Sequence, residues 1–251
     1  MSPFATSAVV FACVFGSSLL GMFVRRLLPD KHLDAESKDA VRLAMGLVAT
    51  TLALVLGLLI ASAKGFYDTQ SAELTQLASN VVLLDRILAH YGPEAADLRT
   101  LLRSSVTREA AIMFAWDGST KTHDQPSPLK GEALFDGIQE LSPKNENQRT
   151  LQAHALSLGI QVGQARWLIL EQRTVPIPMS LLVTLLFWLI ILFISFGLLA
   201  PPNLTVLGTL LVAAGAVSSA IFLIFEMYHP YTGLIRLSDA PIRAALAQLG
   251  Q

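Results

Sequence analysis

Charged side chains are missing from long stretches of this chain. None occurs in residues 1–24, 43–63 or 174–225. A helix needs about 20 apolar residues to cross the hydrocarbon layer of a bilayer. The first two stretches therefore fit one crossing each, and the third fits two because Pro201-Pro202 interrupts it. The predicted transmembrane helices cover about 3–24, 43–63, 178–199 and 204–226.

A soluble protein could also contain uncharged helices, but four of them would need a large polar shell. The chain has 53% hydrophobic and only 15% charged residues, whereas soluble domains have about 25% charged residues. Its net charge of -1 produces no field that would attract nucleic acid. We therefore predict an all-α membrane protein of the bacterial plasma (inner) membrane. Its expected partner is the lipid bilayer, and no nucleic acid is expected.

About 110 residues of more polar chain separate the second and third predicted spans. Leu77, Val81, Leu84 and Leu88 recur there every three or four residues, which is typical of a helix with one apolar face. A similar seam runs from 151 to 169, and ordinary helix packing explains both. The predicted parts are a transmembrane hairpin (1–63), an extramembrane helical segment (64–173), a second hairpin (174–226) and a C-terminal tail (227–251).

The sequence shows no pattern typical of an enzyme or a cofactor site. It contains no glycine-rich phosphate loop, nucleophile elbow or zinc-binding His/Cys cluster. Glu226 and His229 share one helix face, but carboxylate-bridged metal sites need this motif twice. No charged residue lies in the middle of a span, which argues against a proton-coupled transporter. We predict no enzymatic activity, no cofactor and no bound metal.

The second span continues without a break into polar chain that carries Asp68, Gln70 and Glu73. In an oligomer these side chains could surround a pore mouth, although a solvated helix face is the more common explanation. If the chain forms a channel, apolar residues of the second span would form a constriction that closes by excluding water. The candidate pore-lining residues are Leu52, Val55, Leu56 and Leu59.

Two stretches also carry a family resemblance. The first contains Asp68, Gln70 and Glu73, then Leu84-Asp85-Arg86 and Gly92-Pro93-Glu94. The second contains Ser195-Phe196-Gly197, then Glu226, and then Pro230 and Gly233. In these residues and their order, nearly the whole chain resembles the bacterial membrane proteins grouped as a bestrophin-like domain family. The site residues that the resemblance suggests are Asp68, Gln70, Glu73, Asp85, Arg86, Gly92, Pro93, Glu226, Pro230 and Gly233.

This resemblance implies a four-span subunit of an oligomeric channel for small inorganic anions, with the second span lining the pore. The oligomer would consist of identical chains. The sequence lacks the acidic cluster with which bestrophins hold calcium, and Tyr228 stands where the family usually has an aspartate. Both departures argue against calcium gating. Our first prediction of function is a non-conducting membrane scaffold or interaction protein. The alternative is a subunit of a bestrophin-like anion channel.

Overall fold

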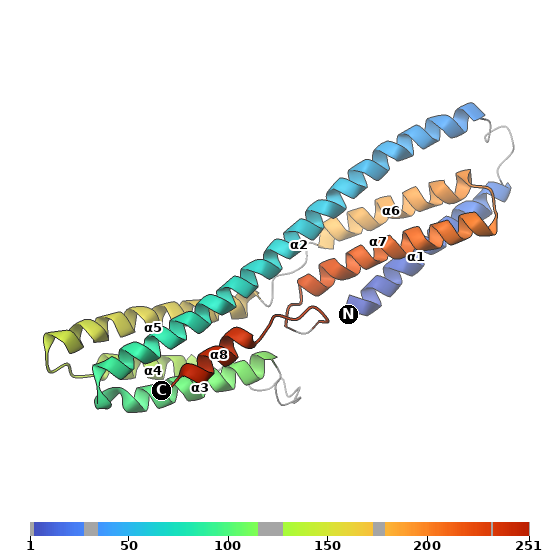
Figure 1. The fold of residues 1–251 in the computed structure, drawn as a ribbon. Coiled ribbons are helices and arrows are strands. Elements are labelled where there is room, and N and C mark those ends of the chain that lie inside the picture. Colours follow the sequence, from blue (N-terminus) through green and yellow to red (C-terminus); the bar gives the residue numbers. More distant parts are fainter. Residues whose placement is uncertain (1–2, 28–34, 115–127, 173–178, 232, 251) are drawn as a thin grey trace. The chain divides into compact units, whose positions relative to one another are not determined.

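The computed structural model describes residues 3–27, 35–114, 128–172, 179–231 and 233–250, and the regular structure in them is helical (Figure 1). The chain forms two compact units. The membrane unit contains Met1–Tyr67 and Pro176–Ile235, and the polar unit contains Asp68–Val175 and Arg236–Gln251. The helices are α1 (Pro3–Leu27), α2 (Ala35–Tyr91), the 3-10 turn η2 (Pro93–Ala95), α3 (Ala96–Phe114), α4 (Pro128–Glu140), α5 (Glu146–Gln172), α6 (Met179–Leu199), α7 (Leu204–Met227) and α8 (Ala240–Gln248).

Four of the described helices are long and apolar enough to cross a membrane: α1, α2, α6 and α7. The predicted all-α membrane fold with four spans is confirmed. The start of the third span at residue 178 lies outside the described residues. Helix α2 has 57 residues, about 85 Å at 1.5 Å per residue. The second span and the first polar seam are therefore parts of one continuous helix.

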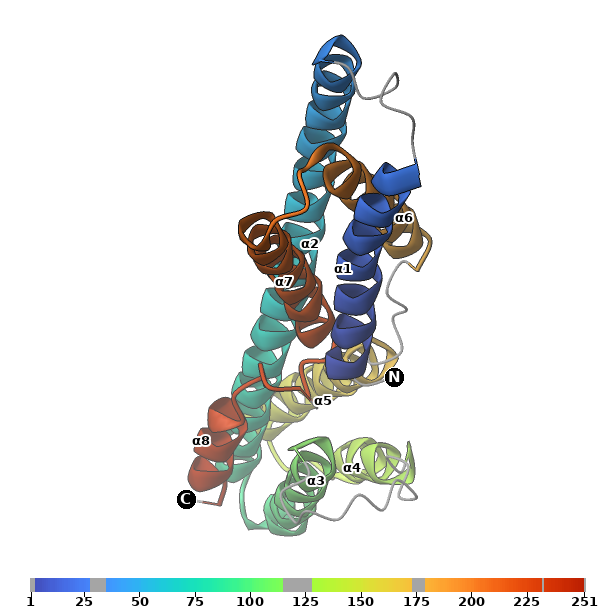
Figure 2. The ribbon, with the colours of Figure 1, turned by 90° about the vertical axis from the view of Figure 1, so that its right-hand side faces the viewer.

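Helix α1 packs along α6 and α7 in the membrane unit (Figure 2). Two glycines bring α1 and α6 into backbone contact. A Cβ atom at Gly21 would collide with the carbonyl of Ile194, and one at Gly197 would collide with the carbonyl of Ser18. Helices in lipid commonly use small residues for such close approach, because apolar side chains alone give no preference for protein over lipid.

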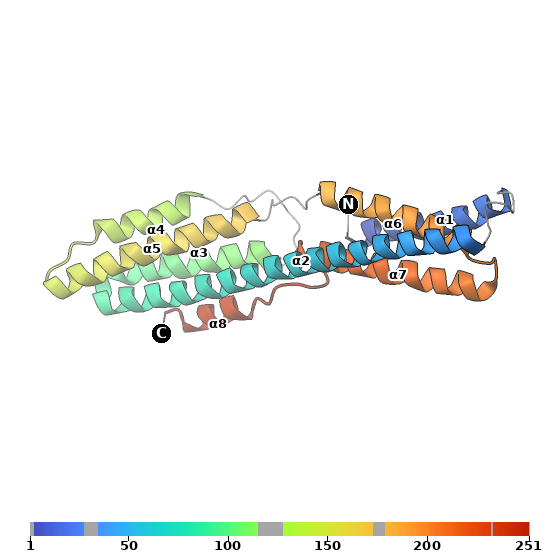
Figure 3. The ribbon, with the colours of Figure 1, turned by 90° about the horizontal axis from the view of Figure 1, so that it is seen from above.

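The polar unit is built around the second half of α2 (Figure 3). The predicted seam is buried there, with Leu84 and Leu88 both 0% exposed. It packs against Leu102 of α3 and Ile138 of α4, and the same cluster includes Ala155 and Leu158 of α5 and Leu249, which follows α8. The residues after Ile235, expected from sequence as part of a tail, thus form helix α8 and contribute to this core.

One glutamine side chain holds the end of α4. Gln152 Nε2 lies 2.9, 3.2 and 2.8 Å from the carbonyl oxygens of Ile138, Gln139 and Leu141. The carbonyls of Ile138 and Gln139 lie in the last turn of α4 and lack partners within the helix, as at every helix C-terminus, and Leu141 follows the helix. We expect Gln152→Ala to lower the free energy of unfolding by about 1–2 kcal/mol, measured by denaturant unfolding in detergent. Truncating the exposed side chain of Gln139 should cost under about 0.5 kcal/mol, so equal losses would contradict this role.

Candidate functional site

The membrane half of α2 has an inner face that packs within its own unit. Leu52 is 8% exposed and belongs to the core formed with α1, α6 and α7. Val55, Leu56 and Leu59 are partly buried against the same core. The structure therefore places all four candidate pore-lining residues toward the interior of the membrane unit.

The opposite face of this half of α2 has no partner among the described residues. Its large side chains are leucines, namely Leu43, Leu47, Leu54 and Leu58, which are 79, 71, 64 and 62% exposed. A parallel row of small residues, Gly46, Ala53, Gly57 and Ala61, is also exposed. Apart from the nearby backbone of α2 itself, no atom of the described residues lies within 4 Å of a Cβ atom placed at Gly46 or Gly57. We call these two rows the outer face of α2.

Glu226, at the end of α7, carries a carboxylate that is buried within the membrane unit. The residue is 3% exposed. Its Oε2 atom accepts hydrogen bonds from the backbone N–H groups of Leu234 and of Ile235, the latter at 3.2 Å. Gly233 lies so close that a Cβ atom there would collide with the carboxylate. The chain after α7 therefore folds back over Glu226, an arrangement that we call the Glu226 cradle.

Neighbouring contacts position the Glu226 cradle. The backbone N–H of His229 donates to the carbonyl of Glu226 at 3.0 Å, and the ring Nδ1 of His229 lies 2.8 Å from the Phe225 carbonyl. The ring of Tyr228 stacks on Phe66 of α2, with 5.3 Å between the ring centroids. Pro230 is buried in the same turn. The resemblance residues Glu226, Pro230 and Gly233 thus come together in one structure at the end of a membrane helix.

A second buried carboxylate joins three segments of the polar unit. Asp85 of α2 is 1% exposed and accepts two hydrogen bonds from Arg99 of α3, at 2.8 and 2.9 Å. The backbone N–H of Gly250 donates to it at 3.2 Å. Burial alone would raise the pKa of Asp85, but these hydrogen bonds and the charge of Arg99 outweigh burial and lower it. Asp85 is therefore held in its ionised form.

The other resemblance residues on α2 have different surroundings. Gln70 is 1% exposed and Glu73 is partly buried, whereas Asp68 is exposed. A ring formed by all three side chains would thus need Gln70 to leave its buried position. After α2, Gly92 has a φ of 128°, a conformation that favours glycine. Pro93 follows it at the start of η2, so this pair makes the turn from α2 toward α3.

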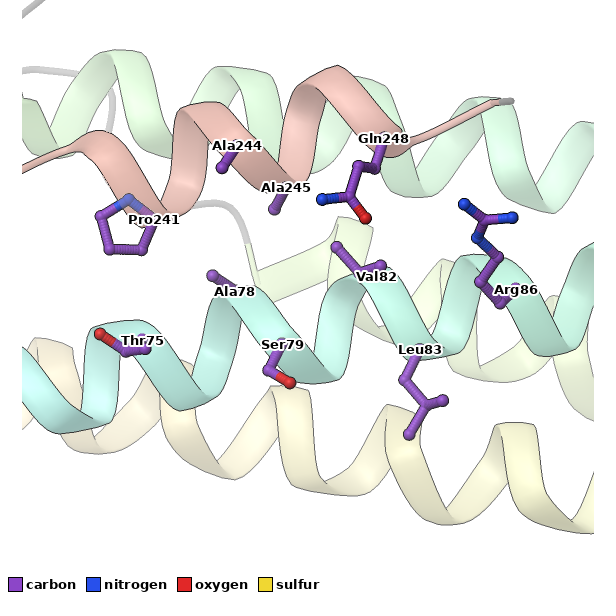
Figure 4. A pocket seen from close by; sticks show the side chains of 10 residues that line it. All are labelled: Thr75, Ala78, Ser79, Val82, Leu83, Arg86, Pro241, Ala244, Ala245 and Gln248. Carbon is purple, nitrogen blue, oxygen red and sulfur yellow. The ribbon is translucent and has the colours of Figure 1, made fainter.

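Arg86 stands at the edge of a groove of about 440 Å³ between α2 and α8. Figure 4 shows Ala244 and Ala245 of α8 opposite Ala78 and Val82 of α2. Arg86 and Gln248 occupy the same end of the groove (Figure 4). The remaining lining residues are Thr75, Ser79, Leu83 and Pro241. Small and apolar side chains dominate this surface, and Arg86 is the single charged group among the described residues that line it.

No cluster of three His, Cys, Asp or Glu side chains able to hold a metal ion occurs in the part of the chain that the structure describes. The buried carboxylates of Glu226 and Asp85 are instead satisfied by donors from the protein. Their arrangement supports structural roles, since each one closes a connection between segments. The most apolar window of α2 is the least buried among the four candidate spans, at 6% against 28% in each of the others.

The chain is similar to known proteins in sequence and in fold. The profile of the Bestrophin-like domain matches residues 11–242. A search of curated proteins finds no match. Among solved structures, two mutant forms of a bacterial bestrophin homologue from Klebsiella pneumoniae are similar. One has a TM-score of 0.71 and 14% identity, covering 99% of this chain and 97% of that one. The other has a TM-score of 0.68 and 13% identity, covering 96% of each chain.

A further crystal structure, described only as a membrane protein, has a TM-score of 0.64 and 14% identity. It covers 98% of this chain and 99% of that chain. At such low identity these likenesses show the fold alone. They cover both the membrane helices and the polar helices.

Proposed function

This chain belongs to the Bestrophin-like domain family, and on that premise we propose that it is a subunit of a homo-oligomeric anion channel in the bacterial inner membrane, which it crosses four times. The family match and the fold likeness to bacterial bestrophin homologues favour the channel over the non-conducting scaffold. The observation that carries the proposal is the outer face of α2. It is uncharged from residue 43 to 63 and has no partner within the described chain.

The two rows of the outer face suit two kinds of contact in a ring of subunits. The row with Gly46 and Gly57 would let the α2 helices of neighbouring subunits approach closely, as small residues do in membranes. The adjacent row of leucines would then face the axis and form the apolar constriction. Because Leu52 and its three companions pack inside the subunit, we assign the pore to Leu54 and Leu58 instead.

Lys64 supports an anion as the permeating species. It is the first charged residue after the uncharged part of α2, and it is exposed. Its ammonium group lies 6.0 Å from the centre of the Tyr67 ring. Repeated around an axis, such lysines would form a ring at the end of the apolar constriction, where the exposed Asp68 four residues later on the same helix would offset part of their charge. Rings of Lys or Arg favour anions over cations in pores.

Chloride efflux from liposomes tests the proposal. We expect the purified wild-type protein to be oligomeric in detergent and to conduct chloride after reconstitution. Leu58→Ala should widen the constriction and raise efflux by about tenfold, equivalent to a barrier about 1.4 kcal/mol lower. Leu211→Ala, which shortens an exposed leucine on α7, should leave efflux unchanged. A monomeric protein that passes no chloride, in wild type and both variants, would support the scaffold instead.

A further inference from the structure

A second groove lies within the membrane unit, where α1 ends and α7 begins. Its volume is about 480 Å³, and its lining includes Leu19, Phe23 and Arg26 of α1 together with Asn203 and Leu207. The uncharged part of α1 stops at Arg25, and α7 starts after the Pro201-Pro202 break. Such ends of membrane-crossing helices lie at the level of lipid headgroups. The groove therefore extends from headgroup depth into the hydrocarbon layer.

The wall of this groove toward the hydrocarbon is apolar and open. Phe23 is 59% exposed and Leu19 is 42% exposed, while Leu207 of α7 completes the wall. In a bilayer an apolar hollow at this depth is in contact with acyl chains and not with water. The side chains are therefore arranged to hold a hydrocarbon chain along α1.

The opposite end of the groove is positively charged. Arg26 is exposed and lines it, and the adjacent Arg25 has a buried Nη1 atom with no hydrogen-bond partner. The N-terminus of α7 adds the positive end of a helix dipole. Asn203 Oδ1 accepts a hydrogen bond from the Val206 N–H at 2.8 Å. The first backbone N–H groups of α7 have no acceptor within the helix. They can therefore donate hydrogen bonds to a group outside it.

We propose that this groove binds one anionic phospholipid. Its phosphate would meet Arg26 and the first amides of α7, and one acyl chain would lie along Leu19, Phe23 and Leu207. No carboxylate occurs among the described lining residues, so an ammonium headgroup has no anionic partner there and would meet the positive charge of Arg26. This chemistry favours phosphatidylglycerol over phosphatidylethanolamine. The proposal does not depend on ion conduction.

Native mass spectrometry of the purified full-length protein tests the site. Phosphatidylglycerol and phosphatidylethanolamine with identical acyl chains would be added separately, and inorganic phosphate would serve as a headgroup control. We expect tighter binding of phosphatidylglycerol. Arg26→Gln should weaken this binding by about tenfold, the size of one lost hydrogen bond to a charged group. Leu207→Trp, which fills the groove and keeps the charge, should also weaken it.

Arg42→Gln is the matched control. Arg42 lies on α2 outside the groove, is exposed and is paired with Asp39 at 3.0 Å, so its loss removes the same charge from the chain and should leave lipid binding unchanged. Equal weakening by Arg26→Gln and Arg42→Gln would overturn the proposal, as would equal binding of the two lipids. Competition by inorganic phosphate at the concentration of the lipid would overturn it too, because the acyl chain would then contribute nothing.

Discussion

Replacing Asp85 with alanine should lower the free energy of unfolding by about 3–5 kcal/mol, the usual cost of breaking a buried ion pair. The change leaves Arg99, whose side chain is only 22% exposed, without its carboxylate. It also removes the acceptor of the Gly250 N–H. Three segments of the polar unit lose a shared contact at once. Thermal and denaturant unfolding in detergent, followed by circular dichroism, would measure the loss.

The pH dependence of stability provides an independent readout of Asp85. Its pKa in the folded protein lies below the ordinary value, which is about 4. The stabilisation is therefore fully present above about pH 4 and is lost as the pH falls through the folded-state pKa. We expect the stability difference between wild type and Asp85→Asn to shrink in this acidic range. Asp39→Ala, at an exposed ion pair, should change stability by less than about 1 kcal/mol.

Removing the carboxylate of the Glu226 cradle is the second change for which we expect a large effect. In Glu226→Ala the N–H groups of Leu234 and Ile235 lose their acceptor. A hydrogen bond to a charged group contributes about 1.5–3 kcal/mol, and both bonds are only partly buried, so the total loss should be about 2–4 kcal/mol. The segment after α7 should also become more sensitive to limited proteolysis. Cleavage confined to this segment would show that the cradle opens locally while the rest of the protein stays folded.

Gly233→Ala provides a second route to the same result. It keeps the carboxylate but introduces a Cβ atom that collides with it, so we expect the same segment to become sensitive to protease. Glu140→Ala is the control, because Glu140 is exposed and its loss should cost under about 0.5 kcal/mol. If Glu226→Ala unfolds like wild type and resists protease equally, the cradle does not hold this segment in place.

The number of membrane helices could be predicted because the bilayer imposes one simple requirement on sequence, an uncharged stretch of sufficient length. The seam through Leu84 and Leu88 could be predicted for a similar reason, because it separates apolar from polar residues in water. The sequence also pointed toward the continuity of α2, since residues 64–73 contain no proline. Helix α2, which runs from Ala35 to Tyr91, confirms this prediction.

The face of the second span that points into the membrane unit could not be predicted in the same way. Leu52 packs inside the unit and Leu54 is exposed, yet both are leucines in an uncharged helix. In lipid an apolar residue is equally suited to either face, so periodicity does not mark the inside. The backbone groups that donate hydrogen bonds to Glu226 and Asp85 could not be predicted either. A backbone N–H group such as that of Gly250 has no recognisable sequence pattern.

The closure of the polar unit by Leu249 and Gly250 has a consequence for biosynthesis. The ribosome makes these residues after the whole segment 68–175 and after both α6 and α7. Until they emerge, the α2 seam lacks a part of its covering, and Asp85 lacks the Gly250 amide. Exposed apolar surface on such an unfinished chain favours aggregation. The nascent polar unit must therefore remain soluble while two further helices enter the membrane, and we expect it to engage cellular chaperones during that interval.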